Sequence, residues 1–463
     1  MNKREASSFR DPAGIVFHHN DEIYRQINLI YKNDYDFFLS SGLYDTLAKK
    51  RKILPFQETA SPVFDQENCY KIIKPLKIDF ISYPYEWSFS QLKDAALLTL
   101  NLQKEALLAN MTLKDASGYN IQFWKGHPVL IDTLSFARYT AGAPWIAYRQ
   151  FCQHFLAPIA LMGFTDIRTS SLLQIYIDGI PLDLASRLLP RSSWLNPGLL
   201  THIHLHAKAQ KKYSADKAAN PDRKPISKTA LVGLIENLEK TVRRIQWKQD
   251  KTTWAEYYGD TNYTDQAFQH KKSVVRELLS ELNPGILLDV GANTGVFSRQ
   301  ALHLKDCVII SSDIDPGAVE QNYLKVKQDR ETNLVPVLVN LANPSPAVGW
   351  QNQERAPFLQ RAHADTIMAL ALIHHLAITN NVPLKNISDL FARLGEHLII
   401  EFIPKEDSQV QRLLASREDI FPEYTLQGFK DAFSSNFTLR KEIPINKSER
   451  TIFLMRRKRT SLA

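Results

Sequence analysis

The sequence predicts an α/β protein in two parts: a mostly parallel sheet of seven strands in the carboxyl-terminal half, and an α+β domain before it. From Ile286 onward, short apolar runs alternate with helical patterns, which is typical of a parallel sheet with helices on both faces. Several of these runs end in an acid or an amide, where such sheets bind ligands. The first half lacks this alternation, but its apolar stretches are sufficient for a core of its own.

Length and composition are those of an ordinary globular protein. The chain has 463 residues, of which 44% are hydrophobic and 23% charged, so two or three domains are expected. Its three cysteines form no C-x-x-C pair, which argues against a disulfide framework or a zinc knuckle and favours a reducing compartment. No apolar run approaches the roughly 20 residues of a membrane span, and the start lacks a signal core. We therefore expect a cytoplasmic protein without a bound metal in its second half.

The net charge of +8 permits contact with nucleic acid or anionic lipid without demonstrating it. Much of the excess lies in a basic stretch with Lys211, Lys212 and Arg223, and in the tail from Arg456 to Arg459. The favoured interpretation is a solvated linker and a solubilising tail, and nucleic-acid binding is the alternative.

The first half begins with patterns for a β-hairpin over residues 9–27 and a helical region over 34–50. An aromatic stretch at 78–87 predicts a strand that runs into a bend. Residues 88–110 then place apolar side chains at helical spacing, with Ser88 as the N-cap.

Asp115 is followed by Asn120 and, after a hairpin pattern, by Asp132. This arrangement resembles the catalytic core of protein-kinase-like and aminoglycoside-phosphotransferase-like folds. The resemblance implies that Asp115 takes the place of the base and that Asn120 and Asp132 bind Mg²⁺ beside ATP. Against it, no Gly-rich phosphate loop is visible, and D-T-L stands where kinases have D-F-G. The nucleotide lysine has only weak candidates in Arg25, Lys71 and Lys74. A helix, a loop and a hairpin with structural acids is the alternative.

Three histidines, His202, His204 and His206, alternate and would share one face of a strand. Without a nearby Cys or carboxylate set, we favour a partly exposed histidine stripe over a metal site. Residues 207–228 are polar and basic, which indicates a linker, and an amphipathic helix over 229–247 follows. The predicted organisation is therefore an α+β domain at 1–206, a linker at 207–228 and the parallel-sheet domain at 229–463.

The first turn of the parallel sheet carries the strongest ligand signal. An apolar strand ends in Asp289, and the small-residue loop after it contains Gly291, Asn293 and Gly295, which tolerate left-handed conformations. The spacing is G-x-x-x-G rather than the G-x-G-x-x-G of dinucleotide sites. About one strand and helix later, Asp313 ends a second strand, where a carboxylate can accept both hydroxyls of a ribose. These features favour an adenosine ligand without a pyrophosphate.

The strands of this sheet, including these first two, are expected near 286–290, 307–312, 334–339, 364–370 and 396–402, with a closing pair near 437–442 and 451–456. Asp289, Asp313, Asn340 and His374 all fall at strand ends, so we expect them on one edge of the sheet. Glu401, in the fifth strand, is expected to border the acceptor. The aromatic stretch at 254–263 would either cover the ligand or pack the first helix.

The motifs L-D-V-G-A-N-T-G, S-D-I-D-P and the run that ends in His374 and His375 resemble class I S-adenosylmethionine (SAM) dependent methyltransferases, over roughly residues 254–457. The resemblance implies a Rossmann-like fold, with Asp289, Gly291 and Gly295 facing the methionine part of SAM and Asp313 the ribose. Asn340 stands where the family often has an Asp near the adenine amine, and an amide oxygen can still accept that hydrogen bond.

His374 or His375 is the natural base if the acceptor is a hydroxyl, and a structural histidine pair is the alternative. No N/D-P-P-Y run is present, which disfavours methylation of DNA bases or protein amides. The chain as a whole resembles long bacterial methyltransferases of the NoeA-like nodulation-protein type, through residues 80–97 and the stretch I-I-E-F-I-P-K.

We therefore expect SAM-dependent methylation of a small-molecule or glycan hydroxyl, with the first domain in substrate recognition or priming. An RNA-binding methyltransferase or basic binding module, and a bifunctional kinase-methyltransferase that also uses ATP and Mg²⁺, are the alternatives.

Overall fold

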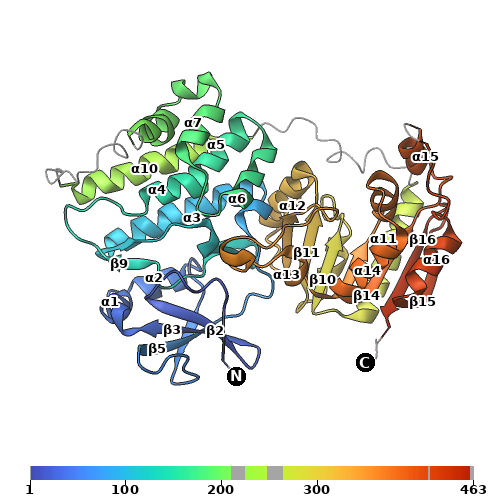
Figure 1. Ribbon diagram of the computed structural model, residues 1–463, viewed down its shortest axis with the longest axis horizontal. Helices are drawn as coiled ribbons and strands as arrows, with labels where there is room; N and C mark the ends of the chain where they lie inside the picture. Colours follow the sequence, from blue (N-terminus) through green and yellow to red (C-terminus); the bar gives the residue numbers. More distant parts are fainter. Residues whose placement is uncertain (1, 210–224, 248–263, 416–417, 459–463) are drawn as a thin grey trace. The chain divides into compact units, whose positions relative to one another are not determined.

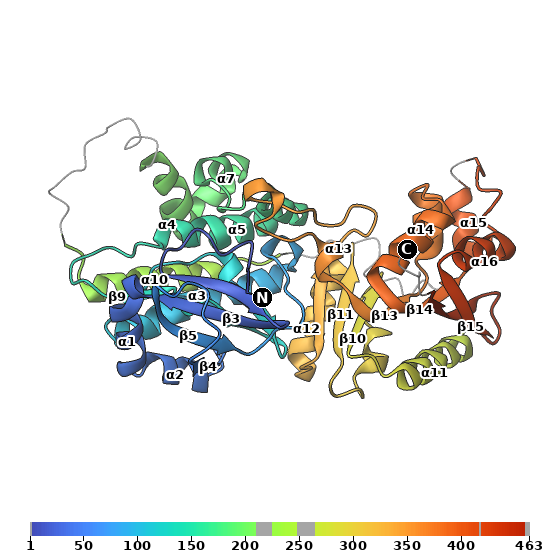
Figure 2. The same cartoon turned by 60° about the horizontal axis from the view of Figure 1, so that its bottom comes forward.

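A computed structural model describes residues 2–209, 225–247, 264–415 and 418–458. The chain divides into two compact units, one formed by Met1–Lys248 with Ala347–Ala356, and the other by Gln249–Pro346 with Pro357–Ala463. Figures 1 and 2 show the ribbon of both units from two directions. The basic stretch with Lys211, Lys212 and Arg223, and the aromatic stretch at 254–263, lie outside the described residues.

The division falls at Lys248 instead of the predicted residue 228. The reason is that helix α10 (Lys228–Arg244) packs along α3 (Phe89–Leu108) of the first unit. Lys104 of α3 contacts Glu239 of α10 at 2.6 Å, and the Lys93 ammonium donates to the Ile245 carbonyl at 2.7 Å. The predicted amphipathic helix is therefore present, but it completes the first unit.

The first unit begins with a five-stranded antiparallel sheet in the order β1-β2-β3-β5-β4. Its strands are β1 (Lys3–Arg4), β2 (Gly14–His19), β3 (Glu22–Asn28), β4 (Phe56–Thr59) and β5 (Cys69–Pro75). The predicted hairpin is confirmed as β2 and β3. Its two-residue turn, Asn20-Asp21, has φ values of 48° and 62°, which suit a tight hairpin turn.

Two small antiparallel pairs follow, β6 with β9 and β7 with β8. They are β6 (Met111–Leu113), β7 (Ile121–Trp124), β8 (His127–Leu130) and β9 (Phe136–Arg138). The hairpin expected between Asn120 and Asp132 is thus present.

Helices make up the rest of this unit. Besides α3 and α10 they are α1 (Lys32–Ser40), α2 (Leu43–Lys49), α4 (Tyr148–Phe151), α5 (Ala157–Phe164), α6 (Leu172–Ile175), α7 (Leu182–Leu188) and α8 (Pro197–Leu199), with 3₁₀ turns η1 (Leu29–Tyr31), η2 (Pro84–Glu86), η3 (Gly118–Asn120), η5 (Ile167–Ser171) and η6 (Arg191–Leu195) and π turns η4 (Cys152–Leu156) and η7 (Leu200–Leu205). The predicted N-cap of α3 is confirmed: the Ser88 hydroxyl accepts a hydrogen bond from the Gln91 N–H, and the Gln91 side chain accepts from the Ser88 N–H.

Two predictions in this unit are wrong. Residues 78–83 form no strand, because the Gln122 side chain takes both backbone groups of Ser82 at 3.0 and 2.8 Å, as a neighbouring strand would. His202 and His204 lie in π turn η7, not in a strand, and both are buried. His202 bonds to Tyr148 and Asn237, and His204 to Ser186 and Ser193, so neither is the partly exposed stripe that we expected.

The second unit is a seven-stranded sheet in the order β12-β11-β10-β13-β14-β16-β15. The first five strands in this order are parallel, and β16, the last in the chain, inserts antiparallel between β14 and β15. The strands are β10 (Ile286–Val290), β11 (Val308–Asp313), β12 (Leu334–Leu338), β13 (Ala364–Ala369), β14 (Gly395–Phe402), β15 (Phe437–Pro444) and β16 (Thr451–Arg457). All seven predicted strands are confirmed, and their order is that of the Rossmann-like class I methyltransferase fold.

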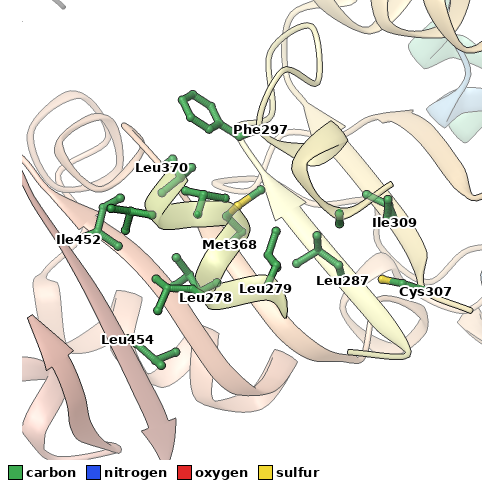
Figure 3. Close-up of a cluster of buried hydrophobic side chains, with 14 of the residues drawn as sticks. Leu278, Leu279, Leu287, Phe297, Cys307, Ile309, Met368, Leu370, Ile452 and Leu454 are labelled. Atoms are coloured by element: carbon green, nitrogen blue, oxygen red, sulfur yellow. The ribbon is translucent and has the colours of Figure 1, made fainter. Parts of the chain in front are cut away.

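Helices cover both faces of this sheet. They are α11 (Asp265–Leu282), η9 (Ser298–Ala301), α12 (Pro316–Asp329), α13 (Phe358–Arg361), η11 (a π turn, His375–Thr379), α14 (Leu384–Leu394), α15 (Ser408–Leu414) and α16 (Leu426–Ser434). On one face, Leu278 and Leu279 of α11 pack against Leu287, Met368 and other strand residues (Figure 3). On β16, Ile452 and Leu454 belong to this core, whereas Phe453 points to the other face and meets Phe429 of α16 with ring centroids 5.1 Å apart.

Residues 347–356 lie between β12 and α13 of the second unit in the sequence, but they belong to the first unit in the structure. This segment, which contains the turn η10 (Trp350–Asn352), is called the crossover segment below. Its Glu354 is 4% exposed and binds the Arg10 guanidinium with two hydrogen bonds of 2.8 and 2.9 Å. The Arg355 guanidinium lies over the Tyr119 ring, 4.1 Å from its centroid. Within the described ranges, no helix is both long and apolar enough to cross a membrane.

Candidate functional site

The turn after β10 has the backbone that its glycines predict. Gly291, Asn293 and Gly295 have φ values of 72°, 52° and 76°. A Cβ on Gly291 would lie 3.1 Å from the Leu372 side chain, and a Cβ on Gly295 would lie 2.6 Å from the Arg299 and Asn322 side chains. Both positions therefore need glycine for space as well as for conformation.

Asp289, the penultimate residue of β10, is almost completely buried, at 2% exposure. The Ser298 hydroxyl of η9 donates to it, and Ser298 also bonds to the Ser311 hydroxyl at 2.8 Å. Burial raises the pKa of Asp289 to about 7, the Ser298 hydrogen bond opposes that rise, and the Asp313 charge adds to it.

Asp313 ends β11, next to the same turn. One carboxylate oxygen accepts the Asn293 N–H at 2.7 Å, and the other accepts the Asp315 N–H at 2.8 Å. Burial raises its pKa to about 6, against the effect of these two backbone donors. Because each carboxylate oxygen has two acceptor sites, Asp313 retains capacity for the two hydroxyls of a ribose.

A cavity of about 290 Å³ opens at the carboxyl ends of the strands, within the second unit. Its polar lining comes from three places. Residues at or just after the ends of β10, β11 and β12 form the first group: Asp289, Asn293, Ser312, Asp313 and Asn340. Residues of η11 and the position after it form the second: His375, Thr379 and Asn380. Helix α11 adds Lys271. Between them the wall is apolar, with Phe297, Ile314, Val339, Leu341, Leu370, Leu372 and Leu376.

Three of the four predicted strand-end residues, Asp289, Asp313 and Asn340, therefore meet at one cavity, whereas His374 does not line it. The turn residue Gly295 does not line the cavity either, and its place against Arg299 and Asn322 gives it a conformational role. Asn340 does line it, and its side-chain oxygen accepts the Ala342 N–H at 2.9 Å, so the adenine contact would use the remaining acceptor site of this oxygen.

The two candidate histidines separate. His375 lines the cavity, whereas His374 is fully buried and neither of its ring nitrogens has a hydrogen-bond partner. Their ring centroids are 4.1 Å apart. Burial lowers the pKa of His375 to about 4, and burial, with the neighbouring His375, Arg450 and Lys271, lowers that of His374 well below its ordinary value. Both imidazoles are therefore neutral near pH 7, and His375 alone reaches the cavity.

Sequence analysis missed Lys271 of α11, which lines the cavity and is 1% exposed. Its ammonium contacts the Glu401 carboxylate at 2.7 Å. Glu401 is fully buried and is not among the lining residues, so our expectation that it borders the acceptor is wrong. A signal for Lys271 was present, because it follows Ala267 and precedes Val275 on the apolar stripe of the helix.

In the first unit, Asn120 and Asp132 are linked through Ser135, and both lie close enough to Asp115 to influence its pKa. The Ser135 hydroxyl donates to Asp132 at 2.6 Å and accepts from the Asn120 amide at 3.3 Å. The Asp115 carboxylate accepts from Gln150 at 2.7 Å, and burial and Asp132 raise its pKa.

Asp132 is already paired. It forms an ion pair with Arg25 of β3 and accepts the Leu134 N–H at 3.1 Å. Against burial, which raises it, Arg25 and the Ser135 hydroxyl hold the pKa of Asp132 below its ordinary value. In the described ranges no three His, Cys, Asp or Glu side chains cluster as a metal site.

No known protein-family profile matches this chain. Among solved structures, the chain is similar to WbdD, named as a bifunctional kinase-methyltransferase, with 15% identity, a TM-score of 0.31 and coverage of 45% of this chain and 44% of WbdD. It is also similar to magnesium protoporphyrin IX methyltransferase of Synechocystis PCC 6803, with 15% identity, a TM-score of 0.29 and coverage of 44% of this chain and 89% of that one. The fold assignment above rests on the chain's own strand order.

A much stronger similarity covers nearly the whole chain. Nodulation protein NoeA of Rhizobium meliloti (strain 1021) is 34% identical over 460 residues, which span 98% of this chain and 96% of NoeA. With both units and both sets of site residues inside that span, the chain belongs to the NoeA family of nodulation proteins.

Proposed function

We propose that this protein is a SAM-dependent methyltransferase that methylates a hydroxyl group of an uncharged small molecule or glycan. The observation that carries the proposal is the cavity in which the Gly291 turn, Asp313 and Asn340 meet at the carboxyl ends of three adjacent parallel strands. The strand order of the second unit, which is that of class I methyltransferases, supports it independently.

The residues present fit this cofactor. Gly291 lines the cavity in a left-handed conformation and without a side chain, so a ligand can approach the backbone there. Asp313 would hold the ribose hydroxyls, Asn340 the adenine amine, and Asp289 the amino group of the methionine part. When bound, SAM supplies an electrophilic methyl group on a sulfonium.

The acceptor side of the cavity is uncharged. His375, Thr379 and Asn380 are its polar groups, and burial keeps His375 neutral. Among the described lining residues the positive charge is that of Lys271, which is paired with Glu401, whereas a hydroxyl compound finds hydrogen-bond donors and acceptors at His375, Thr379 and Asn380. With a pKa of about 4, His375 is better suited to orient a hydroxyl than to deprotonate it at neutral pH. Alignment and exclusion of water by the apolar wall would then carry most of the acceleration.

The RNA-binding alternative receives less support. In the described part of the tail, Arg456 pairs with Glu396 at 2.8 Å, and the Arg457 guanidinium donates to the Ala392 carbonyl at 3.0 Å. These cations are thus partly engaged within their own unit and are poorly placed as a phosphate-binding row.

For the first unit we propose a recognition role. Phosphotransfer is the competing role, because Asp115, Asn120 and Asp132 do meet at one place. The Arg25–Asp132 ion pair favours recognition, since a metal ion would have to displace this guanidinium. If ATP with Mg²⁺ raises the melting temperature of the wild-type protein but not of the Asp132→Ala variant, phosphotransfer is the better assignment.

The test of the main proposal uses SAM with a tritiated methyl group and an extract of the source organism. We expect label in a product that resists protease, ribonuclease and mild alkali, as a methyl ether does. The Asp313→Ala variant should transfer little label, and Asp365→Asn, an acid at the opposite edge of the sheet, should transfer as the wild type does. Label in RNA or protein would overturn the acceptor class, and failure to bind SAM would overturn the proposal as a whole.

A further inference from the structure

Lys271 places a buried positive charge at the cofactor cavity. Its ammonium lies 2.7 Å from the Glu401 carboxylate and 4.5 Å from the centroid of the Phe297 ring. Burial lowers its pKa, and the Glu401 charge opposes that shift. Moving an ammonium out of water is energetically costly even after the surrounding protein relaxes. The Glu401 carboxylate offsets this cost and so stabilises a charged lysine at this position.

Lys271 and Asp289 both line the cavity. Among the described residues that line it, Lys271 is the one with a positive charge. Asp289 is close enough to Lys271 to influence its pKa, and Asp289 is the penultimate residue of the strand that leads into the Gly291 turn. The end of the cavity near the first turn therefore offers one acid and one ammonium.

A ligand with an amino acid part is a zwitterion, with an α-ammonium and an α-carboxylate on one carbon. A carboxylate that enters a buried site needs a cation or several N–H donors to replace its water. Asp289 matches the α-ammonium and Lys271 matches the α-carboxylate, so the two charges of the site complement the two charges of the ligand.

We propose that Lys271 binds the α-carboxylate of the cofactor, and that this contact distinguishes SAM and its product from adenosine ligands that lack the carboxylate. This inference rests on the proposed function and adds a residue to it. A lysine ammonium has three N–H donors, so it can hold Glu401 and the ligand carboxylate at the same time.

Glu401 gives the contact a second consequence. The same carboxylate oxygen that binds Lys271 also accepts the Ala371 N–H at 2.7 Å. Ala371 has φ of 51°, a left-handed conformation that is unfavourable for a residue with a Cβ. The turn continues into Leu372, whose side chain lies next to Gly291. The Leu372 carbonyl accepts the N–H of His375 at 3.0 Å. The Lys271–Glu401 pair therefore connects the carboxylate end of the cofactor to the turn that carries the acceptor side.

The experiment compares two ligands that differ only in the carboxylate: S-adenosylhomocysteine (SAH) and its decarboxylated analogue, S-adenosyl-3-thiopropylamine. Calorimetry with the full chain should show that Lys271→Met weakens SAH binding roughly 10- to 100-fold, the effect of losing one charged hydrogen bond. Binding of the decarboxylated analogue should change by less than about 3-fold. Lys272→Met, which removes a charge from the next residue outside the cavity lining, should leave both affinities as in the wild type.

Each outcome decides the proposal. If Lys271→Met weakens both ligands equally, Lys271 acts through the fold and the carboxylate assignment is wrong. If SAH binding is unchanged, the assignment is also wrong. If the single variant does not fold because the buried Glu401 charge loses its ammonium, the Lys271→Met/Glu401→Gln double variant replaces it, since a glutamine oxygen can still accept the Ala371 N–H. Failure of the wild type to bind either ligand would instead refute the proposed function.

Discussion

Substitution of Asp313 is the sharpest test of the cofactor site. The carboxylate is 8% exposed and holds the backbone at both Asn293 and Asp315, so an alanine would disturb the turn as well as the ligand. Asp313→Asn keeps the shape and one acceptor oxygen, but it removes the charge and takes the acceptor from one of these two backbone N–H groups. A hydrogen bond to a charged group contributes about 1.5–3 kcal/mol, whereas a neutral one contributes about 1 kcal/mol.

The expected effect follows from two ribose hydroxyls. One hydroxyl would lose its acceptor, because the amide NH₂ cannot accept, and the other would keep a neutral acceptor in place of a charged one. Together these changes amount to about 2–3 kcal/mol, a loss of roughly 30- to 150-fold in affinity. Asp313→Ala, which removes both acceptors, should weaken binding at least as much.

Calorimetric titration with SAH measures this loss without methyl transfer. The matched control is Asp365→Asn, because Asp365 also accepts a backbone N–H, that of Ile286 at 2.9 Å, but does so at the opposite edge of the sheet. Its affinity for SAH should equal that of the wild type. Unchanged SAH binding in a folded Asp313→Asn protein, or an equal loss in the control, would refute the ribose assignment.

Three further predictions concern pH, backbone and the first unit. The ribose hydroxyls favour ionised Asp313, whose pKa is raised to about 6 without ligand. SAH affinity should therefore fall as the pH drops through about 6, and binding near that pH should release protons. Equal calorimetric affinities from pH 5 to pH 8 would contradict this. In chemical denaturation, Gly295→Ala should lower the free energy of unfolding of the second unit by at least roughly 1–2 kcal/mol, the cost of the left-handed conformation alone. Gly233→Ala in helix α10 should have no such effect, because no atom lies within 4 Å of the added Cβ. Arg25→Met should destabilise the first unit by about 3 kcal/mol because it removes the ionic partner of the largely buried Asp132 carboxylate. Lys74→Met, which breaks an exposed pair with Glu22, should change stability by less than about 1 kcal/mol, and equal effects of the two would argue against a stabilising ion pair at Asp132.

The second unit was predictable because its signals are local. Each strand is a short apolar run, and the helices between them have their own periodicity, so no distant contact is needed to locate them. Asp289, Asp313 and Asn340 could be placed on one edge because parallel strands bring their carboxyl ends together. Their meeting at one cavity follows from that rule alone.

The structural features that could not be predicted from the sequence depend on contacts between distant residues. Lys271 and Glu401 are 130 positions apart, and each is a single charge inside an apolar pattern. The stretch at 78–83 has the composition of a strand, but the backbone N–H of Ser82 donates to the side chain of Gln122, 40 positions away. The separation of His374 from His375 depends on how the turn at Ala371 is held, which no spacing rule predicts.

The crossover segment has a consequence for how the protein is made and inherited. Its Glu354 pairs with Arg10 across 344 positions of sequence, so the first unit receives its last piece only after the ribosome has synthesised strands β10, β11 and β12. The strands and helices at the beginning of the chain must therefore wait for about a hundred residues of the other unit before their contacts are complete. Recombination that replaced everything after Lys248 would also replace this piece of the first unit, and a foreign segment without an acid at the position of Glu354 would leave the Arg10 guanidinium without this partner. The two halves are thus expected to pass between genomes together, as a single inherited unit.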